Sequence, residues 1–536
     1  MIRNYLIGIG GTGARVIESV LHLCAAGYGP ESLSMFLIDP DQANSNLSRT
    51  KTLISQYQAA ASAWHDKGSR QEARPFGTQI KTAQNSIWTV FANNDVTLSG
   101  FVNEKTLRQS NEEYAQLISV LFTEAELQTP LSRGFRGHPS IGSVVMSNAE
   151  AGKESSNKDM VPAQALEQLW QDIQDSNEGD ARVFLVGSVF GGTGAAGVPT
   201  FGSPKMLKHH EKAKLDNGGS RVHLGGALVL PYFSFEADAE AVKKEKQDMY
   251  VTPADFPIAT KAALEYYNEK ELAFDELYFI GDSLGADHRV GKFGTGGKEQ
   301  NNRPHYIELV TALAALDFWR EASVRTSTRE CFIAARNDQT VTWDMLPVTR
   351  DKGQLNALQV LLAHRIASMT TLGYVLNTYA ADFLNRPHGA GENNVGWYKD
   401  HFKFDAKKSQ DDGKDPRKGA NFSSLNAVRS YTAEFVRWIT DIGALPRVQL
   451  VDGTKLWADD EAMLPPLQHA GGIGGFLVGQ ARPAGSATFN EFLAQLNSVR
   501  ITDQAMSASD RFLNLLQEAS DAFCRQAYGL EPYARR

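Results

Sequence analysis

Two glycine-rich segments constrain the fold of this chain more than any other feature. The first reads Gly8-Ile9-Gly10-Gly11-Thr12-Gly13 and follows the apolar run 5–7. The second reads Gly191-Gly192-Thr193-Gly194-Ala195-Ala196-Gly197 and follows the apolar run 183–186. A strand that ends in glycines and continues as a helix exposes backbone N–H groups at the helix N-terminus, which suits a phosphate. Two such segments therefore predict one phosphorylated ligand that is held from several sides.

The first half of the chain alternates short apolar runs with helical patterns, which is typical of an α/β domain with a mainly parallel sheet. Strands are predicted at 5–8, 34–38, 181–186, 223–230 and 276–280, and helices at 14–26, 159–175 and 256–271. The polar stretch from about 55 to 128 carries no sharp motif, and we interpret it as an insertion.

The chain has 536 residues, too many for one ordinary hydrophobic core, so two domains are expected. Apolar residues at helical spacing predict a buried helix over 306–322. We expect the segment 303–322 to connect a first domain, 1–302, to a C-terminal α+β domain, 323–536. Within the latter, helices are predicted at 354–383, 427–442 and 507–528, and a charged loop at 388–423.

Composition excludes several classes of protein. A net charge of −8 argues against a broad nucleic-acid surface. The three cysteines form no CxxC pair, which excludes a disulfide framework or a four-cysteine zinc site and fits a reducing cytosol. No window approaches the ~20 apolar residues that span a bilayer. We therefore expect a cytoplasmic protein with no membrane partner, and no metal-ligand cluster is assigned.

The glycine segments resemble those of the tubulin/FtsZ superfamily. The second lacks the Gly-Lys-Ser/Thr of a P-loop and is similar to that family's Gly-Gly-Thr-Gly-Ser/Thr-Gly phosphate loop, with Ala195 at the hydroxyl position. The first is similar to the Gly-x-Gly-Gly-x-Gly that opens FtsZ. Three further segments resemble loops of the same family in the same order. They are Asp39-Pro40-Asp41-Gln42-Ala43-Asn44, Arg133-Gly134-Phe135-Arg136-Gly137-His138-Pro139-Ser140-Ile141-Gly142 and Pro231-Tyr232-Phe233-Ser234-Phe235-Glu236.

This resemblance covers residues 1 to about 240 and implies a divergent bacterial tubulin-like protein with a Rossmann-like GTPase domain. It implies GTP or GDP with Mg²⁺ as ligands. The implied nucleotide-binding residues are Gly10, Gly11, Thr12, Gly13, Asp39, Asp41, Asn44, Gly134, Arg136, Gly137, Gly191, Gly192, Thr193, Gly194, Ala195, Pro231 and Glu236. Two positions depart from the family pattern. Arg136 replaces a small residue, so that it either faces the terminal phosphate or pairs with a carboxylate at the surface, and Glu240 replaces an arginine.

Guanine presents N–H donors on one edge and needs a carboxylate or amide acceptor. Glu308 is the first candidate, Asn302 the second, and Tyr306 could stack on the base. A carboxylate in the first helical turn could equally serve the helix dipole.

The resemblance also implies hydrolysis at an interface between head-to-tail subunits, where acidic residues of one chain complete the site of the next. The family's Asn-x-Asp-x-x-Asp/Glu string is not reproduced. The nearest catalytic candidates are Asp338 and Asp344, which could also be solvated turn residues. We thus expect a GTP-binding, self-associating filament protein that is a GTPase with slow or assembly-dependent activity and that has a further protein partner.

Three alternatives stay open at this point. The same site could gate a scaffold that does not polymerise. The first glycine segment with Asp39, Asp41 and 45–49 is also similar to ThiF/ubiquitin-activating adenylating enzymes, which leaves the Thr193 segment unexplained. A Rossmann oxidoreductase would place Asp39 on an adenosine ribose.

Overall fold

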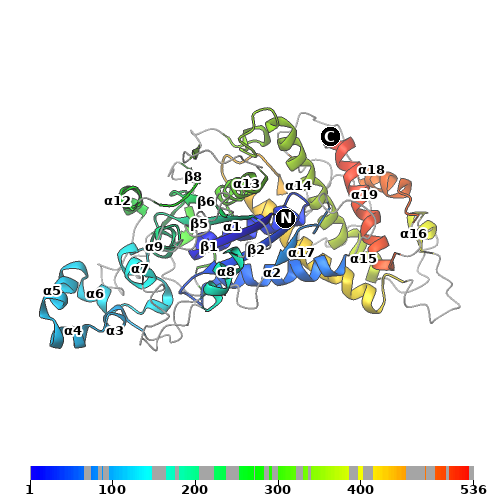
Figure 1. Ribbon diagram of the computed structural model, residues 1–536. Helices are drawn as coiled ribbons and strands as arrows, with labels where there is room; N and C mark the ends of the chain where they lie inside the picture. Colours follow the sequence, from blue (N-terminus) through cyan, green and yellow to red (C-terminus); the bar gives the residue numbers. More distant parts are fainter. Residues whose placement is uncertain are drawn as a thin grey trace.

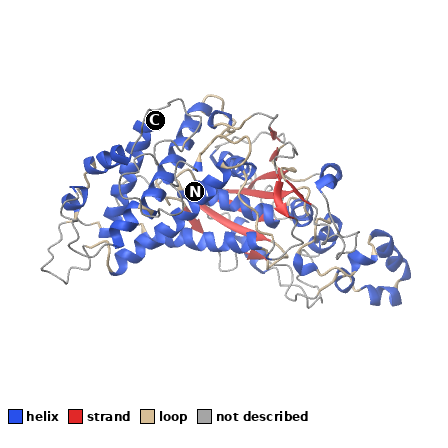
Figure 2. Ribbon diagram, turned by 180° about the vertical axis from the view of Figure 1, so that it is seen from behind, coloured by secondary structure: helices blue, strands red, loops and turns tan. Residues whose placement is uncertain are grey.

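The computed structural model shows an α/β fold around one parallel β-sheet, with helices on both faces (Figures 1 and 2). It describes residues 2–64, 74–81, 87–88, 96–147, 164–174, 180–203, 222–236, 253–270, 272–282, 289–292, 298, 300–320, 330–335, 340–385, 396–402, 415–453, 477, 489–502 and 506–529. The mainly parallel sheet predicted from the sequence is confirmed.

Within the described residues, the sheet contains eight strands in the order β10-β8-β6-β5-β1-β2-β3, and β4 pairs with β2 outside this path. All of these pairs are parallel. The strands are β1 (Arg3–Ile9), β2 (Ser32–Ile38), β3 (Gln79–Lys81), β4 (Ile87–Trp88), β5 (Ala181–Ser188), β6 (Val222–Val229), β8 (Glu276–Gly281) and β10 (Glu330–Ala335). Every residue of β1 and β5 is buried, as expected for central strands of a parallel sheet covered on both faces.

The chain order of the strands reverses between β1 and β5. From β1 the sheet continues to β2 on one side, and from β5 it continues to β6 on the other. In open α/β sheets of this kind, the crevice outside the carboxyl ends of the strands at the reversal point is the usual ligand site. Both glycine segments start from these two strand ends.

Alternate residues of each strand feed two separate apolar clusters, because successive side chains point to opposite faces. Leu6 and Phe184 pack with α1 (Gly10–Ala25), α2 (Ser45–Ala63) and α13 (Tyr306–Arg320). Ile7 and Leu185 pack with α7 (Pro139–Ser147), α8 (Gln164–Gln174), α9 (Gly192–Phe201) and α12 (Phe256–Glu269).

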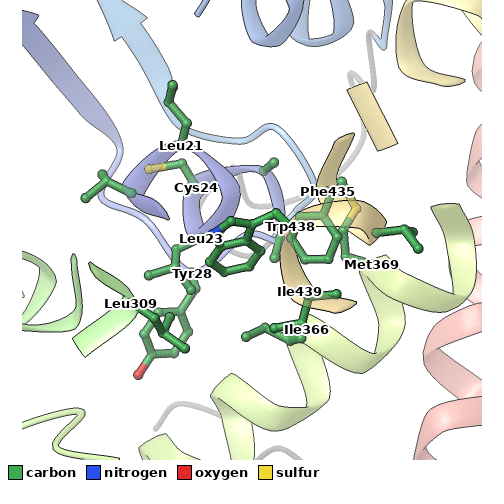
Figure 3. Packing of buried hydrophobic residues seen from close by; sticks show 14 of the residues in the cluster. Leu21, Leu23, Cys24, Tyr28, Leu309, Ile366, Met369, Phe435, Trp438 and Ile439 are labelled. Carbon is green, nitrogen blue, oxygen red and sulfur yellow. The ribbon is translucent and has the colours of Figure 1, made fainter. Parts of the chain in front are cut away.

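The chain after β10 is mainly helical where it is described. It contains α14 (Leu355–Asn377), α15 (Tyr379–Asn385), α16 (Gly396–His401), α17 (Gly419–Gly443), α18 (Phe489–Ser498) and α19 (Ala508–Tyr528). Figure 3 shows Trp438 and Phe435 of α17 packed against Leu23 at the end of α1. His22 stacks on Trp438 with ring centroids 4.8 Å apart. The sheet and the C-terminal helices therefore share one apolar cluster.

This packing differs from the expected division of the chain. The strand β10 lies beyond residue 302 but pairs with β8, so the first sheet extends past the predicted boundary. The helix α13 covers the sheet beside α1 and is buried over nearly its whole length, so it is a core helix more than a connector. In the described C-terminal residues after β10, strand pairing is limited to the isolated bridges Val341–Val448 and Val451–Leu477, in place of the expected α+β arrangement.

The stretch 55–128 is also more than an insertion. It begins inside α2 and supplies β3 and β4 to the sheet edge. Its remaining described part forms α3 (Leu98–Phe101), α4 (Glu104–Ser110), α5 (Glu112–Leu121) and α6 (Glu124–Leu127), which project from the body at one end (Figure 1). Sequence periodicity could not reveal β3 and β4 because two or three residues are too few to show alternation.

The remaining elements are short: η2 (Leu131–Arg133), β7 (Ser234–Glu236), η6 (Pro253–Asp255), β9 (Arg289–Lys292), which pairs with β7, and η8 (Trp343–Met345). Predicted helices at 256–271, 427–442 and 507–528 are confirmed as α12, α17 and α19, and 354–383 is divided into α14 and α15. Of the predicted loop 388–423, the described parts fall in α16 and around the start of α17. Among the helices that the structure describes, none has the length and apolar character needed to cross a lipid bilayer.

Candidate functional site

The two glycine segments lie against each other at the reversal point of the sheet. Gly10 has φ +73°, and a Cβ atom placed on it would lie 3.2 Å from Thr193 Cβ and 3.4 Å from Gly194 N. A side chain at position 10 would thus be strained in backbone conformation and crowded by the second segment. A shared ligand requires this convergence, although the segments are about 180 residues apart in sequence.

Each glycine segment opens a helix whose first turn faces the crevice. The residues that precede these helices, Ile9 and Gly191, have no side chain that could accept a hydrogen bond from the first N–H groups, and neither first turn contains an acidic residue. The first N–H groups of a helix lack partners within the helix, and the helix dipole makes this end positive. Two positive helix ends therefore meet at one point, which favours an anion.

The later glycine of each segment allows the helix to pack directly on its strand. A Cβ on Gly13 would lie 2.7 Å from Gly8 C, and a Cβ on Gly194 would lie 2.6 Å from Ser188 O. Contacts this short are sterically forbidden, so no larger residue fits without movement of backbone. The two segments are thus built in the same way.

A third loop, residues 134–137, reaches the second glycine segment and the loop at Asp41. Gly134, Arg136 and Gly137 all have positive φ angles, of +74°, +45° and +84°. A Cβ on Gly134 would lie 4.0 Å from Thr193 Oγ1 and 3.8 Å from Asp41 Cβ. Because Arg136 is half-buried and adopts a backbone conformation that is uncommon outside glycine, the surrounding structure must hold this loop in place.

Two buried carboxylates follow the end of β2. Asp39 and Asp41 are each 2% exposed. Asp39 Oδ1 accepts a hydrogen bond from Asp41 N at 3.0 Å, whereas Asp39 Oδ2 has no hydrogen-bond partner among the described residues. Burial raises the pKa of Asp39 to about 7. A buried, unpartnered carboxylate oxygen next to an anion site is a fitting ligand for a cation that accompanies the anion.

We expect Asp39→Asn to stabilise the unliganded protein above pH 7. In the unfolded chain Asp39 ionises near pH 4, but in the folded protein it does so near pH 7. The folded state therefore binds the additional proton between these values and loses stability as the pH rises through this window. One pKa unit corresponds to about 1.4 kcal/mol, so the stability that Asp39→Asn gains at pH 8 is at most about 4 kcal/mol, and this gain disappears near pH 4.

Chemical denaturation at several pH values measures the free energy of unfolding of both proteins, with Asp344→Asn at an exposed carboxylate as the control. A variant gain that does not change with pH would contradict the assignment.

Amide side chains tie residues 300–302 to the start of α2, next to the first glycine segment. Asn44 accepts from Asn46 N at 2.9 Å and donates through Nδ2 to Gln300 Oε1 at 2.8 Å. Asn46 Nδ2 donates to Asn302 Oδ1, and Asn302 N donates to Asn46 Oδ1, both at 3.0 Å. A Cβ on Gly11 would lie 3.4 Å from Asn44 Nδ2. The structure thus brings Asn44 and Asn302 to the same cluster as Gly11.

Glu308 lies elsewhere, in a buried network. Its carboxylate is 2.7 Å from Arg15 Nε and accepts a hydrogen bond from Tyr232 OH at 2.7 Å, both on Oε1. Its other oxygen accepts from His305 N at 3.0 Å. Since Glu308 is 1% exposed and both oxygens are engaged within the protein, the geometry favours a structural role over the predicted contact with guanine.

The structure places four further predicted nucleotide-binding residues as follows. Tyr306 is buried, with its ring 4.8 Å from that of His305. Pro231 is buried, and the Ala195 carbonyl accepts a hydrogen bond from Tyr267 OH at 2.7 Å. Glu236 ends β7, but its side chain lies outside the described residues.

Asp344 lies at the opposite, amino edge of the sheet. Its side chain in η8 is exposed, and its carbonyl accepts from Gln359 Nε2 at 2.7 Å. The neighbouring Leu358 carbonyl accepts from the hydroxyl of Tyr28, which lies in the turn before the first residue of β2. Asp338 lies outside the described residues. The predicted catalytic carboxylate and the glycine segments thus occupy opposite ends of the same strands.

Sequence reasoning missed Arg15 and Glu18. Arg49 pairs with Glu18 through Nη2 at 2.9 Å and donates to the Asn302 carbonyl, so it ties α1 and α2 to the 300–302 loop. The sequence did carry a signal for Arg15 and Glu18, since both are charged residues within the apolar helix that follows the first glycine segment. Charged residues at buried positions are almost always paired, so a buried ion pair could have been predicted there.

Comparison with known proteins leaves the family of this chain open. No family model matches it, and no curated protein matches it.

Proposed function

We propose that this protein is a tubulin-like GTP-binding protein that hydrolyses GTP at the interface between head-to-tail subunits. The observation that carries the proposal is the convergence of the two glycine segments, with Gly10 against Thr193, at the reversal point of a doubly wound sheet. The loops around Asp41 and Gly134 meet at the same place. Several loops around one crevice suit a polyphosphate better than a single turn does.

The proposal assigns a role to each loop. The first turns of α1 and α9 would hold the phosphates, and Asn302 would contact the base. Asp39, Asp41 and Thr193 would hold Mg²⁺, since the unpartnered Asp39 oxygen offers a hard ligand. When bound, Mg²⁺ neutralises phosphate charge.

The distance between the two edges of the sheet favours a site shared by two subunits. The strand β5 has eight residues, and at about 3.3 Å per residue it separates its two ends by roughly 25 Å. Asp344 near one edge therefore does not reach a nucleotide at the other edge of its own chain. If subunits stack head to tail, the amino edge of one chain faces the nucleotide of the next.

The adenylating-enzyme alternative has less support. It requires Arg49 at a phosphate, but this guanidinium is engaged by Glu18 and the 300–302 loop. It also assigns no role to Thr193. A nucleotide-gated scaffold that does not polymerise would use the same pocket and differs only in assembly. The three unpaired cysteines fit the cytoplasmic location that the proposal implies.

The test combines nucleotide content, assembly and turnover. We expect purified protein to retain GTP or GDP and to pellet on addition of GTP and Mg²⁺.

We expect Asp344→Ala to bind GTP as tightly as wild type but to lose most of its turnover, by about 100-fold for a positioning carboxylate. Turnover should partly return when Asp344→Ala is mixed with Gly192→Ala, because the intact Asp344 of the second variant meets the intact nucleotide site of the first. Retained adenine nucleotide, or full turnover in Asp344→Ala, would refute the corresponding part of the proposal.

A further inference from the structure

The helices α3–α6, which we call the projecting group, contact the loop 134–137 through one carboxylate. Glu126 of α6 places Oε1 3.1 Å from Nδ1 of His138, and the two side chains are 12% and 18% exposed. Its other oxygen, Oε2, accepts a hydrogen bond from Thr123 N at 2.8 Å in the capping box of α6. The second ring nitrogen of His138, Nε2, is buried without a hydrogen-bond partner among the described residues. Glu126 is therefore the group that fixes this ring.

His138 is the last residue of the turn that contains Arg136. Its N–H donates to the Phe135 carbonyl at 2.7 Å, and the two residues between them, Arg136 and Gly137, have φ +45° and +84°. Positive φ at both central residues is the signature of a type I′ turn. Because Arg136 is not glycine, this turn persists only where its surroundings hold it. A contact that fixes the ring of His138 therefore restrains the turn.

The same turn packs directly on the second glycine segment. A Cβ on Gly192 would lie 2.8 Å from Phe135 Cβ, and a Cβ on Gly142 of α7 would lie 2.6 Å from Ala196 Cβ of α9. Leu127 of α6 and Phe135 belong to one apolar cluster. Figure 1 shows α7 between the projecting group and α9. Close contacts thus lead from α6 through the turn to the first residues of α9.

We propose that Glu126 and His138 are positioning residues for the phosphate site, through which the projecting group holds the 134–137 loop in the arrangement that binds nucleotide. The identity of the ligand rests on the proposed function. The coupling is reciprocal, as linkage between two sites requires. Nucleotide that orders the loop therefore also stabilises α6, and a molecule that displaces α6 weakens the binding of nucleotide.

Variants of His138 separate this role from a contribution to stability alone. His138→Leu should weaken the binding of a fluorescent GTP analogue by about 10-fold, within the usual range for coupled sites. His138→Asn should keep most of the affinity, because its amide offers an N–H donor to Glu126. Arg108→Leu is the matched control. It breaks the Arg108–Glu104 pair, which joins two residues of α4 in the same projecting group, and it should bind as tightly as wild type.

Hydrogen exchange tests the contact without nucleotide. In the unliganded protein, the amides of residues 134–138 should exchange faster in His138→Leu than in wild type, and at the wild-type rate in Arg108→Leu. Addition of GTP should slow exchange at residues 123–127 in wild type, and much less in His138→Leu.

Each outcome bears on one proposal. Wild-type exchange at 134–138 in His138→Leu overturns the positioning role, and so does wild-type affinity for the GTP analogue. Equal weakening of nucleotide binding by Arg108→Leu also overturns it, in favour of general destabilisation of the projecting group. A wild-type protein that binds no GTP refutes the proposed function instead, and exchange in the unliganded protein still decides whether the Glu126–His138 contact holds the loop.

Discussion

Gly192→Ala is expected to weaken nucleotide binding by about 100-fold while the protein stays folded. A Cβ at this position would lie 2.8 Å from Phe135 Cβ and 3.0 Å from the Phe135 carbonyl oxygen. The clash involves the backbone of the 134–137 loop, which cannot rotate away as a flexible side chain does. The loop must therefore move away from the second glycine segment. Loss of one or two hydrogen bonds to a charged phosphate, each contributing about 1.5–3 kcal/mol, weakens binding on the order of 100-fold.

The measurement is equilibrium binding of a fluorescent GTP analogue, with circular dichroism to verify the fold. Gly100→Ala is the matched control, because its Cβ would meet only Thr97 Oγ1 at 3.4 Å, in the remote helix α3. If Gly192→Ala binds nucleotide as tightly as Gly100→Ala does, the convergence of these two loops is not the ligand site.

Glu308→Leu is expected to have the largest effect on stability, a loss of about 3–5 kcal/mol in the free energy of unfolding. Arg15 and Glu308 have side chains 4% and 2% exposed, so the substitution leaves a buried guanidinium without its paired carboxylate. Tyr232, whose pKa burial raises well above its ordinary value, would remain next to it but cannot neutralise the charge.

The double variant Arg15→Met/Glu308→Leu separates the charge from the packing. Replacing both partners of a buried ion pair with apolar side chains of similar volume is often neutral, so most of the lost stability should return. Chemical denaturation measures both variants, and the preference for GTP over ATP is measured alongside. A double variant as unstable as Glu308→Leu would refute the ion-pair explanation. If Glu308→Leu instead kept its stability and lost only the preference for GTP, the original assignment of Glu308 to guanine would be restored.

Local pattern was sufficient to predict most of the sheet. The sequences of β1 and β5 contain continuous apolar runs instead of alternating apolar and polar residues. This pattern is typical of strands that helices cover on both faces. The helices α12 and α19 were placed within a few residues because their periodicity and end signals agree. By contrast, β3 and β4 are too short to show a period. The strand β10 follows the predicted domain boundary, so its sequence was equally compatible with a strand of the C-terminal domain.

The candidate site was predicted unevenly for a similar reason. Glycines that must adopt positive φ or accept a close backbone, such as Gly10 and Gly13, are visible as glycines in the sequence. The partners of a carboxylate are not visible. Glu308 looked like a ligand for a base because its position in the first helical turn was known and its contact with Arg15 was not.

By itself, the amino-acid sequence determined that strands end in glycine turns and that helices begin there, because both depend on neighbours in the chain. Only the tertiary structure decided that the turns around Gly10, Asp41, Gly134 and Thr193 meet at one point, and that Asp344 lies at the far edge of the sheet. The physical reason is that strand order, which no local pattern encodes, sets which strand ends are neighbours. The burial of Arg15 against Glu308 follows from that same order, since it places α13 beside α1.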